Sequence, residues 1–453
     1  MRALPTDVLT RAGLSTSEVE EWALAGGLTP DSFEAAAAAL SGFLVRGQAL
    51  GEQLLSSRDG DHAAYRDLTA ALTAARDSFM TVHAEALYDQ LTDGFAKPIR
   101  VEQLVYDAAA LIPGLVPSRS EMDAERARPL ADKHGLELAQ GLLVGHVLAL
   151  PRAGRHLIAS MLAPTRRGLE LLADFQATGV ADLGYALVTR EGPAAVVELR
   201  NQRHLNAEDD ATLGPTEAAV DLALLDPAVE VGILRGAVVD HPRYAGERVF
   251  GSGINLTLLY QGKIDFLFYL IRDLGYVSKI YRGLETDDGT TEKLWVAAVE
   301  RYAIGGACQL LHVVDHVIAI RGSRLYLPAR KEGIIPGASN LRLPRAVGDR
   351  AARQAILSGR EWTAGEPDAD LIVDQVVEPG EMDPALEARI EALTSSGLIN
   401  AAANRAAMRV GAEPLDLFRE YMATYAREQA YCHLSPALVR NLEEHWNADR
   451  RSI

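Results

Sequence analysis

The stretch AAVERYAIGGACQLLHVVDHVIA, residues 297–319, places a pair of glycines between two apolar segments. A run of small and β-branched residues leads into the pair Gly305-Gly306, and an apolar segment follows it. This pattern predicts a buried strand, a turn at the two glycines and then an apolar helix. Such a turn lets a ligand approach the main chain closely, and the first amides of a helix have no acceptor within it. The turn therefore suits an anion, although glycines also occupy such turns for packing alone.

A second glycine turn lies upstream, in GERVFGSGINL at residues 246–256. Gly251 and Gly253 flank Ser252 after a short β-rich run. Leu256 stands where a dinucleotide-binding fingerprint would have its last glycine, so we reject a Rossmann site. Two separate turns that each offer main-chain amides instead suit the two halves of an oxyanion hole.

Length and composition limit the class of protein. A chain of 453 residues predicts two or three folding units, and a net charge of -17 argues against nucleic acid as a partner. The two cysteines are too few for a disulfide framework. The longest apolar stretch, residues 141–150, is too short to span a bilayer, and the start of the chain lacks the apolar core of a signal peptide. We expect a soluble, cytoplasmic protein with no membrane partner.

Three regions differ in their sequence patterns. Residues 1–183 are Ala-rich, with apolar residues at helical spacing, and predict a helical N-terminal domain. Residues 184–380 alternate β-rich runs with helical segments and predict an α/β core, including a hairpin at 184–201 and a helical segment over 264–283. Residues 381–453 predict a C-terminal helical segment.

Four stretches of the core resemble, in order, the signature blocks of the crotonase (enoyl-CoA hydratase/isomerase) superfamily: HLNAED at 204–209, RVFGSGIN at 248–255, the stretch at 297–319, and LPARKEGIIPGASNLRL at 327–343. The resemblance implies an α/β fold, a crotonase-like spiral of ββα units between the helical N-terminal domain and C-terminal helices that close the active site and form subunit contacts. In that family two main-chain amides hold a thioester oxygen. By matching position they are those of Ile254 and Gly306.

Hydratases of this superfamily carry two catalytic glutamates. The matching positions here are Gln309, three residues after Gly306, and Ala329, directly after the proline of the fourth block. An amide and a methyl group cannot transfer the protons of water. The resemblance therefore implies a site that holds a thioester enolate but does not hydrate.

The segments NAEDD, GACQLL and KEGIIPGASNLRL, together with the long helical N-terminal region, resemble the oxygenase branch of the superfamily. This implies a dioxygenase with no metal or other cofactor, whose partners are an arylacetyl-CoA and O2. It would convert 3,5-dihydroxyphenylacetyl-CoA and O2 to 3,5-dihydroxyphenylglyoxylate and CoA, as a homotrimer or a hexamer. Two alternatives stay open: another acyl-CoA enzyme of the superfamily, such as a thioesterase or isomerase, and a noncatalytic acyl-CoA binding protein.

The resemblance also implies roles for individual side chains. Glu208 and Arg272 would bind the polar aromatic end of the substrate, Gln309 would line the reaction pocket, and Ile334 would wall the oxygen pocket. Taken alone, these residues fit helix capping for Glu208, a surface ion pair for Arg272 and core packing for Ile334 equally well or better.

Two further sets of residues bear on ligands. Arg248, just before the upstream glycine turn, is the best candidate to hold the CoA phosphates, ahead of Arg203 and Lys263. His312 and His316 stand four apart on the predicted helix and raise the alternative of a metal site. No third ligand is indicated on the same face, so we predict structural histidines and no bound metal.

Overall fold

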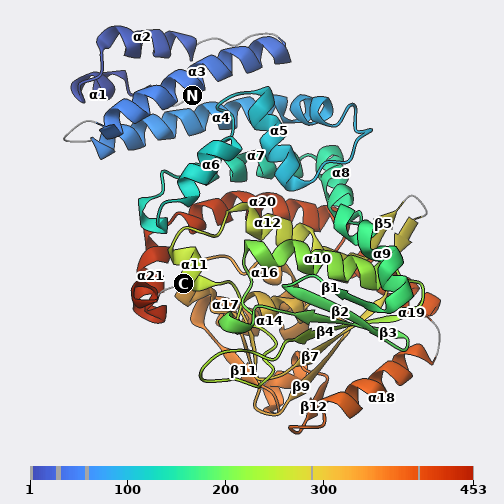
Figure 1. Ribbon diagram of the computed structural model, residues 1–453. Helices are drawn as coiled ribbons and strands as arrows, with labels where there is room; N and C mark the ends of the chain where they lie inside the picture. Colours follow the sequence, from blue (N-terminus) through green and yellow to red (C-terminus); the bar gives the residue numbers. More distant parts are fainter. Residues whose placement is uncertain (1–3, 27–31, 57–60, 287–288, 396–397, 452–453) are drawn as a thin grey trace.

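The computed structural model describes residues 4–26, 32–56, 61–286, 289–395 and 398–451. Figure 1 shows a layer of helices from the first part of the chain, packed against an α/β core. The predicted α/β class is therefore confirmed. Within the described residues, no helix has both the length and the apolar character needed to cross a bilayer.

Among the described residues up to 178, the N-terminal layer contains helices and their connecting loops but no strand. The long pair α3 and α4 packs through leucines at helical spacing, such as Leu40, Leu44 and Leu68, and the side chain of Asp61 caps the start of α4. The helices of this layer are α1 (Thr6–Arg11), α2 (Thr16–Ala25), α3 (Phe33–Ser56), α4 (His62–Leu91), α5 (Val101–Leu111), α6 (Arg119–Arg126), α7 (Glu137–Ala149), α8 (Pro151–Leu162) and α9 (Arg166–Thr178).

A seven-stranded mixed sheet forms the centre of the core, in the order β1-β2-β3-β4-β7-β9-β12. The hairpin predicted at 184–201 is present as β2 and β3, whereas β3, β4, β7, β9 and β12 run parallel. Every residue of β7 is buried, as is typical of a parallel strand covered on both faces. The strands are β1 (Val180–Asp182), β2 (Ala186–Glu191), β3 (Ala194–Leu199), β4 (Val231–Gly236), β7 (Leu294–Val299), β9 (His316–Ile320) and β12 (Gln375–Val377).

Two smaller sheets complete the strands. β8 (Tyr302–Ile304), β10 (Arg324–Tyr326) and β11 (Glu361–Thr363) form one, and β5 (Leu284–Thr286) pairs with β6 (Gly289–Thr291) in the other. The helices of the core are α10 (Asp210–Leu225), α11 (Leu256–Tyr260), α12 (Leu267–Leu274), α13 (Tyr276–Arg282), α14 (Gly306–Leu310), α15 (Ala329–Glu332), α16 (Ser339–Val347) and α17 (Asp349–Ser358).

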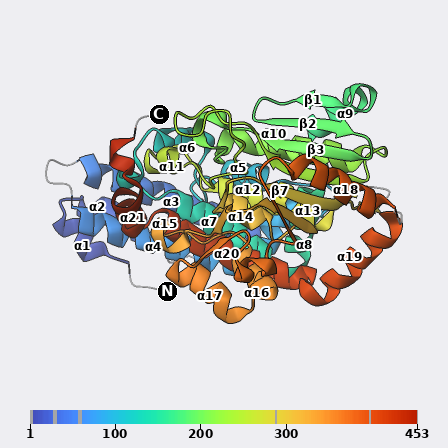
Figure 2. The ribbon, with the colours of Figure 1, turned by 90° about the horizontal axis from the view of Figure 1, so that it is seen from below.

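Four helices follow the core: α18 (Met382–Thr394), α19 (Leu398–Ala412), α20 (Leu415–His433) and α21 (Pro436–Trp446). Seen from below in Figure 2, α18 and α19 lie at the opposite end of the molecule from α1 and α2. In contrast, α20 turns back and packs along α7 of the N-terminal layer.

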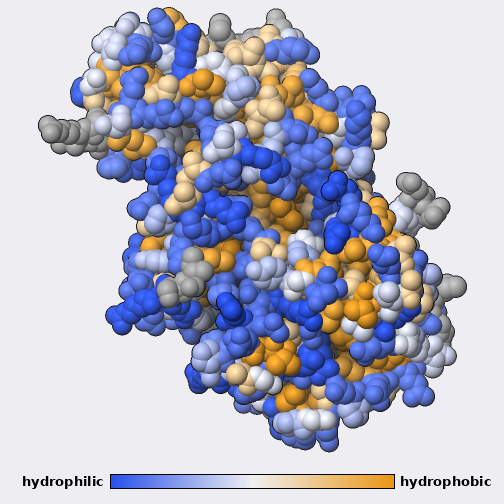
Figure 3. Space-filling model, in the orientation of Figure 1, coloured by the Kyte–Doolittle hydropathy of each residue, from blue (hydrophilic) through white to orange (hydrophobic). Residues whose placement is uncertain are grey.

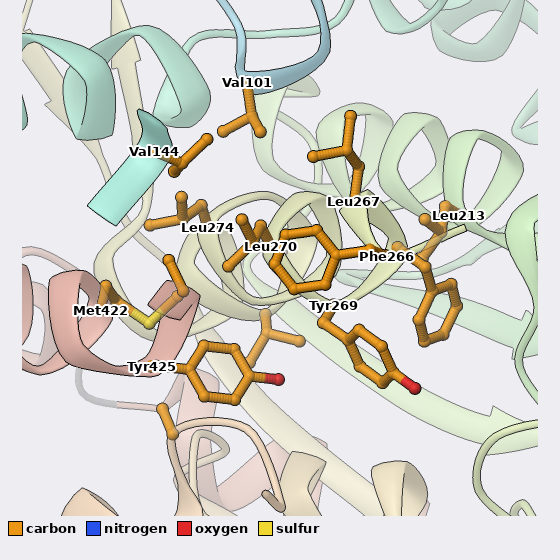
Figure 4. Close-up of a cluster of buried hydrophobic side chains, with 14 of the residues drawn as sticks. Val101, Val144, Leu213, Phe266, Leu267, Tyr269, Leu270, Leu274, Met422 and Tyr425 are labelled. Atoms are coloured by element: carbon orange, nitrogen blue, oxygen red, sulfur yellow. The ribbon is translucent and has the colours of Figure 1, made fainter. Parts of the chain in front are cut away.

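One continuous apolar core joins the three regions. Figure 4 shows Val144 of α7, Leu270 of α12 and Met422 of α20 in a single cluster, and all three are fully buried. On the face shown in Figure 3, apolar side chains gather over the junction between the helical layer and the core, where a cleft is lined by residues of α5, α6, α10 and α12.

The helical segment predicted over 264–283 is confirmed as two helices, α12 and α13, which are separated at Gly275. The β-position of Gly275 faces the carbonyl oxygen of Ile271 at 2.5 Å and leaves no room for a side chain. One helix prediction needs correction. The helix predicted after the glycine pair ends at Leu310, because residues from His316 onwards pair as strand β9 with β7. His312 and His316 therefore do not share a helix face.

Candidate active site

A small cavity lies between the two glycine turns and helices α12, α14, α15 and α20. Its volume is about 30 Å³, which is room for one water-sized molecule. The structure brings six of the seven predicted site residues to this cavity: Glu208, Ile254, Arg272, Gly306, Gln309 and Ile334. The seventh, Arg248, does not line it.

The two glycine turns are held side by side by main-chain hydrogen bonds. The amide of Gly251 donates to the carbonyl of Tyr302, and the amide of Ile304 donates back to Gly251, both at 3.1 Å. A β-carbon built on Gly253 would lie 2.9 Å from the carbonyl oxygen of Ile304 and 3.4 Å from the nitrogen of Gly306. The turns are thus in contact, and the backbone of Ile304 leaves no room for a side chain at Gly253.

The amides of Ile254 and Gly306 are available to a ligand. The main chain of Glu208 binds the residues on either side of Ile254. The amide of Glu208 donates to the carbonyl of Gly253 at 2.7 Å, and the carbonyl of Glu208 accepts from the amide of Asn255 at 2.8 Å. Gly306 opens α14 and has no intrahelical acceptor. Among the described residues, no main-chain acceptor is bonded to either amide. Both residues line the same cavity, as an oxyanion hole requires.

Both glycines of the 305–306 pair are required by geometry. Gly305 has φ of 54° and ψ of -118°, which side-chain-bearing residues rarely adopt. A β-carbon on Gly306 would overlap Oε2 of Glu208 and lie 3.2 Å from Nη2 of Arg272. The backbone of the turn is therefore in close contact with the ion pair of Glu208 and Arg272.

Arg272 is the centre of the polar network. Its Nε donates to Oε1 of Glu208 at 2.8 Å, its Nη1 donates to Asp273 and Gln309 at 2.9 Å each, and its Nη2 donates to the carbonyl of Gly306 at 2.7 Å. The side chain is only 4% exposed, so this is not a surface ion pair. Burial opposes the charge, but Glu208 and its other partners raise the pKa of Arg272 well above the usual value. The guanidinium is permanently charged and rigidly held.

The break at Gly275 gives Glu208 a second donor. It allows Tyr276, the first residue of α13, to donate its hydroxyl to the same Oε1 that Arg272 binds. No hydrogen bond from the described residues reaches Oε2 of Glu208, which faces Gly306. That oxygen is free to accept a hydroxyl group of a ligand.

Gln309 is oriented by its contact with Arg272. Because its carbonyl oxygen accepts from Arg272, its NH2 group is left to donate elsewhere. Close packing fixes this side chain from the other side, since a β-carbon on Gly337 would meet both Gln309 and Asp273. Gln309 thus offers the cavity a neutral donor where hydratases have an acid.

A carboxyl group that we did not predict also lines the cavity. Glu332 ends the short helix α15, one turn after Ala329, and is 5% exposed. Burial raises the pKa of Glu332 to about 8. The sequence held a signal for it, because residues three apart in a helix share a face, so Ala329 and Glu332 point inwards while Arg330 and Lys331 are exposed.

The candidate CoA-binding cations lie elsewhere. Arg248 donates to Glu198 at 2.7 Å and to the carbonyl of Gly236 at 3.0 Å. Lys263 donates to the carbonyl of Arg126, and Arg203 is exposed. A phosphate contact by Arg248 stays a prediction.

The contacts of His312 and His316 and the burial of Cys308 fit structural roles. His312 is bonded to Ser339 at 3.1 Å, and burial lowers its pKa to about 4, whereas His316 faces Asp374 at 3.6 Å. Burial raises the pKa of the Cys308 thiol to about 12. Among the described residues, no group of three or more His, Cys, Asp or Glu side chains has a metal-binding arrangement.

Comparison with known proteins places this site in a family. Residues 189–430 match the family described as enoyl-CoA hydratase/isomerase. The chain is 50% identical over 364 residues to (3,5-dihydroxyphenyl)acetyl-CoA 1,2-dioxygenase of Amycolatopsis orientalis, covering 79% of this chain and 83% of that one. It is 30% identical over 197 residues to a probable enoyl-CoA hydratase of Rhizobium meliloti (strain 1021), covering 43% of this chain and 70% of that one.

Solved structures include a crystal structure of an enoyl-CoA hydratase from Mycobacterium avium subsp. paratuberculosis K-10, 20% identical, with a TM-score of 0.49 and coverage of 59% of this chain and 97% of that one. The family match covers more than half of the chain, and the identity to the Amycolatopsis orientalis enzyme extends over most of it. Together they assign the chain to a family. The chain belongs to the enoyl-CoA hydratase/isomerase family.

Proposed function

We infer that this protein is an oxidoreductase, a dioxygenase that acts on 3,5-dihydroxyphenylacetyl-CoA. The observation that carries this function is the 50% identity, over 79% of the chain, to the Amycolatopsis orientalis enzyme that bears this activity in its name. The site agrees with it, because Gln309 and Ala329 replace the hydratase glutamates while two free amides face one cavity. The products we propose are 3,5-dihydroxyphenylglyoxylate and CoA.

The two free amides give the site its first chemical task. Removing a benzylic proton from the thioester leaves an enolate, whose negative oxygen needs donors fixed in advance. The amides of Ile254 and Gly306 supply them, and each such donor is worth about 3–4 kcal/mol of barrier lowering. The amide of Gly306 also stands at the first position of a helix, where the unpaired main-chain N–H groups favour negative charge.

The charged pair gives the site its specificity for a phenolic ring. Oε2 of Glu208 has no hydrogen-bond donor among the described residues and can accept a phenol hydroxyl, while Arg272 fixes the carboxyl group through Oε1. The cavity of about 30 Å³ has room for O2 but not for an aromatic ring. We therefore propose that side chains lining the cavity move when the ring enters, with Ile334 remaining as an apolar wall beside O2.

The reaction we propose needs no metal or other cofactor. The enolate carbon is electron-rich enough to react with O2 and give a peroxide. That peroxide closes on the thioester carbonyl, CoA leaves, and cleavage of the O–O bond yields the keto acid. The neutral NH2 of Gln309 can donate to the developing peroxide without adding a negative charge to it.

We also propose a homotrimer or a hexamer. Apolar side chains on the C-terminal helices remain exposed in the single chain, among them Met408 and Val410 of α19 and Leu417 of α20, with 66%, 74% and 43% exposure. Such exposed apolar residues support a subunit contact there.

Incubation of the protein with 3,5-dihydroxyphenylacetyl-CoA in the presence of EDTA tests the function. We expect O2 uptake, CoA release and glyoxylate formation in equal amounts, after metal analysis has shown the protein to be metal-free. The matched control is the same mixture under argon, in which no glyoxylate should form. CoA release at an equal rate with and without O2 would instead identify a thioesterase.

A further inference from the structure

We propose that Glu332 is the catalytic base that removes the benzylic proton of the thioester substrate. This inference rests on the proposed function and supplies the one group that a carbanion mechanism needs and that neither glycine turn provides. Glu332 lines the same cavity as the two free amides. A β-carbon built on Gly305 would lie 3.9 Å from Oε1 of Glu332, so the carboxyl group borders the Gly305-Gly306 turn.

Glu332 differs from the other two carboxyl groups of the cavity because no cation is paired with it among the described residues. Glu208 is bound through Oε1 by Arg272 and Tyr276. Asp273 is also paired with Arg272, through Oδ1, and its Oδ2 has no hydrogen-bond partner but is buried against Gly337. In contrast, no hydrogen bond or ion pair within the described part of the chain reaches the carboxyl group of Glu332.

The short helix α15 fixes this side chain in place. The amides of Glu332 and Gly333 donate to Pro328 and Ala329 at 2.9 Å and 2.7 Å, and Gly333 ends the helix with φ of 88°. The methyl group of Ala329 leaves the inner face of the helix open, and Glu332 lies one turn further along the same face. The site therefore has a carboxyl group displaced by one helical turn from the position that resembles the hydratase acid.

The surroundings of Glu332 suit proton removal from carbon. An apolar, unpaired environment disfavours its charged form, and this raises its pKa to about 8. A base with a raised pKa is better matched to a weakly acidic C–H bond than an ordinary carboxylate. The consequence is that the carboxylate form, and with it the reaction, should increase as the pH rises through about 8.

The proton and electron balance closes with this assignment. The benzylic C–H bond breaks, its proton passes to Glu332, and its electron pair forms the enolate that the two amides hold. The carbon then bonds to O2, and attack of the peroxide on the thioester carbonyl breaks the C–S bond. The CoA thiolate takes the proton from Glu332. The regenerated carboxylate accepts the second benzylic proton as the O–O bond breaks, so the methylene carbon is oxidised to a ketone and O2 is reduced. Glu332 then releases this proton to solvent as the keto acid leaves as its anion, and the carboxylate is restored for the next turnover.

Hydrogen exchange without O2 isolates the proton transfer. Under argon in D2O, the wild-type protein is expected to exchange the benzylic hydrogens of 3,5-dihydroxyphenylacetyl-CoA for deuterium. Glu332→Gln, which keeps the shape of the side chain, should lower the exchange rate and the aerobic kcat by about 10²-fold or more. Glu332→Asp keeps a carboxyl group and should retain more exchange than Glu332→Gln. Lys331→Gln changes the exposed neighbour on the same helix and should leave both rates unchanged.

A pH profile gives a second and independent readout. Wild-type kcat/KM should rise as the pH increases through about 8, whereas the residual kcat/KM of Glu332→Gln should not show this rise. If Glu332→Gln exchanges the benzylic hydrogens at the wild-type rate and still turns over, Glu332 is not the base. The proposed function is unaffected by that result. If Glu332→Gln does not fold, a wild-type kcat/KM that does not change through about pH 8 rejects the base. A wild-type protein that takes up no O2 overturns the proposed function together with this inference.

Discussion

Replacing Gly306 with proline is expected to lower kcat by about 10²- to 10³-fold, because it deletes one of the two amides that hold the enolate oxygen. Gly306 is the first residue of α14, a position at which proline fits the helix and breaks no intrahelical hydrogen bond. The backbone fold should therefore survive the change, with the end of the Glu208 side chain displaced to make room for the ring. Circular dichroism and thermal unfolding check the fold, and aerobic CoA release under saturating substrate gives kcat.

The matched control for this variant is Gly306→Ala. Its β-carbon meets Glu208 and Arg272 as the proline ring does, but its N–H group remains. The fall in kcat of Gly306→Ala should therefore come from the displaced Glu208 carboxyl group alone. Any further fall in kcat of Gly306→Pro should come from the loss of the amide. A folded Gly306→Pro protein with the same kcat as Gly306→Ala would remove this amide from the mechanism.

Arg272→Met should destabilise the protein and abolish turnover together. The change leaves the buried carboxyl group of Asp273 and the partly buried one of Glu208 without their cation, and breaking a buried ion pair in this way costs about 3–5 kcal/mol. It also frees Gln309 and the carbonyl of Gly306, so the reaction pocket loses its geometry. A lower urea midpoint and a loss of kcat/KM are the expected results.

Two controls separate charge from position in this experiment. Arg272→Lys keeps the charge, but a single ammonium group cannot reproduce the fork that binds four partners, so we expect stability to recover more than kcat. Arg235→Met breaks a two-point ion pair with Glu300 that lies outside the cavity, and it should leave kcat intact. If Arg272→Met turned over at the wild-type rate, the network around Arg272 would have no role in the reaction.

Much of the fold could be predicted from the sequence because local patterns agree with the final packing. The hairpin at 184–201, the strand at 294–299 and the helices before residue 180 follow directly from the spacing of apolar residues. The helix expected after Gly306 was wrong beyond Leu310. Short apolar runs do not distinguish a helix from a strand, and pairing with β7 decides between them only in three dimensions.

The site was predicted less completely, for reasons that particular residues show. Ile254, Gly306, Gln309, Glu208, Arg272 and Ile334 came from matching positions, and the structure places them around one cavity. Glu332 was missed because it stands one turn away from the position where an acid was sought. The break at Gly275, which directs Tyr276 to Glu208, depends on close contact with Ile271, and no local pattern reveals that contact.

An ¹⁸O2 incubation tests whether the enolate held by the two main-chain amides reacts with O2 itself. The product should be reduced immediately with borohydride, so that the ketone oxygen cannot exchange with water, and then analysed by mass spectrometry. We predict that both oxygen atoms of one O2 molecule enter the product, one at the former benzylic carbon and one in the carboxylate. A carboxylate that takes its new oxygen from H2¹⁸O, with none from ¹⁸O2, would contradict the account, because the thioester would then be cleaved by water.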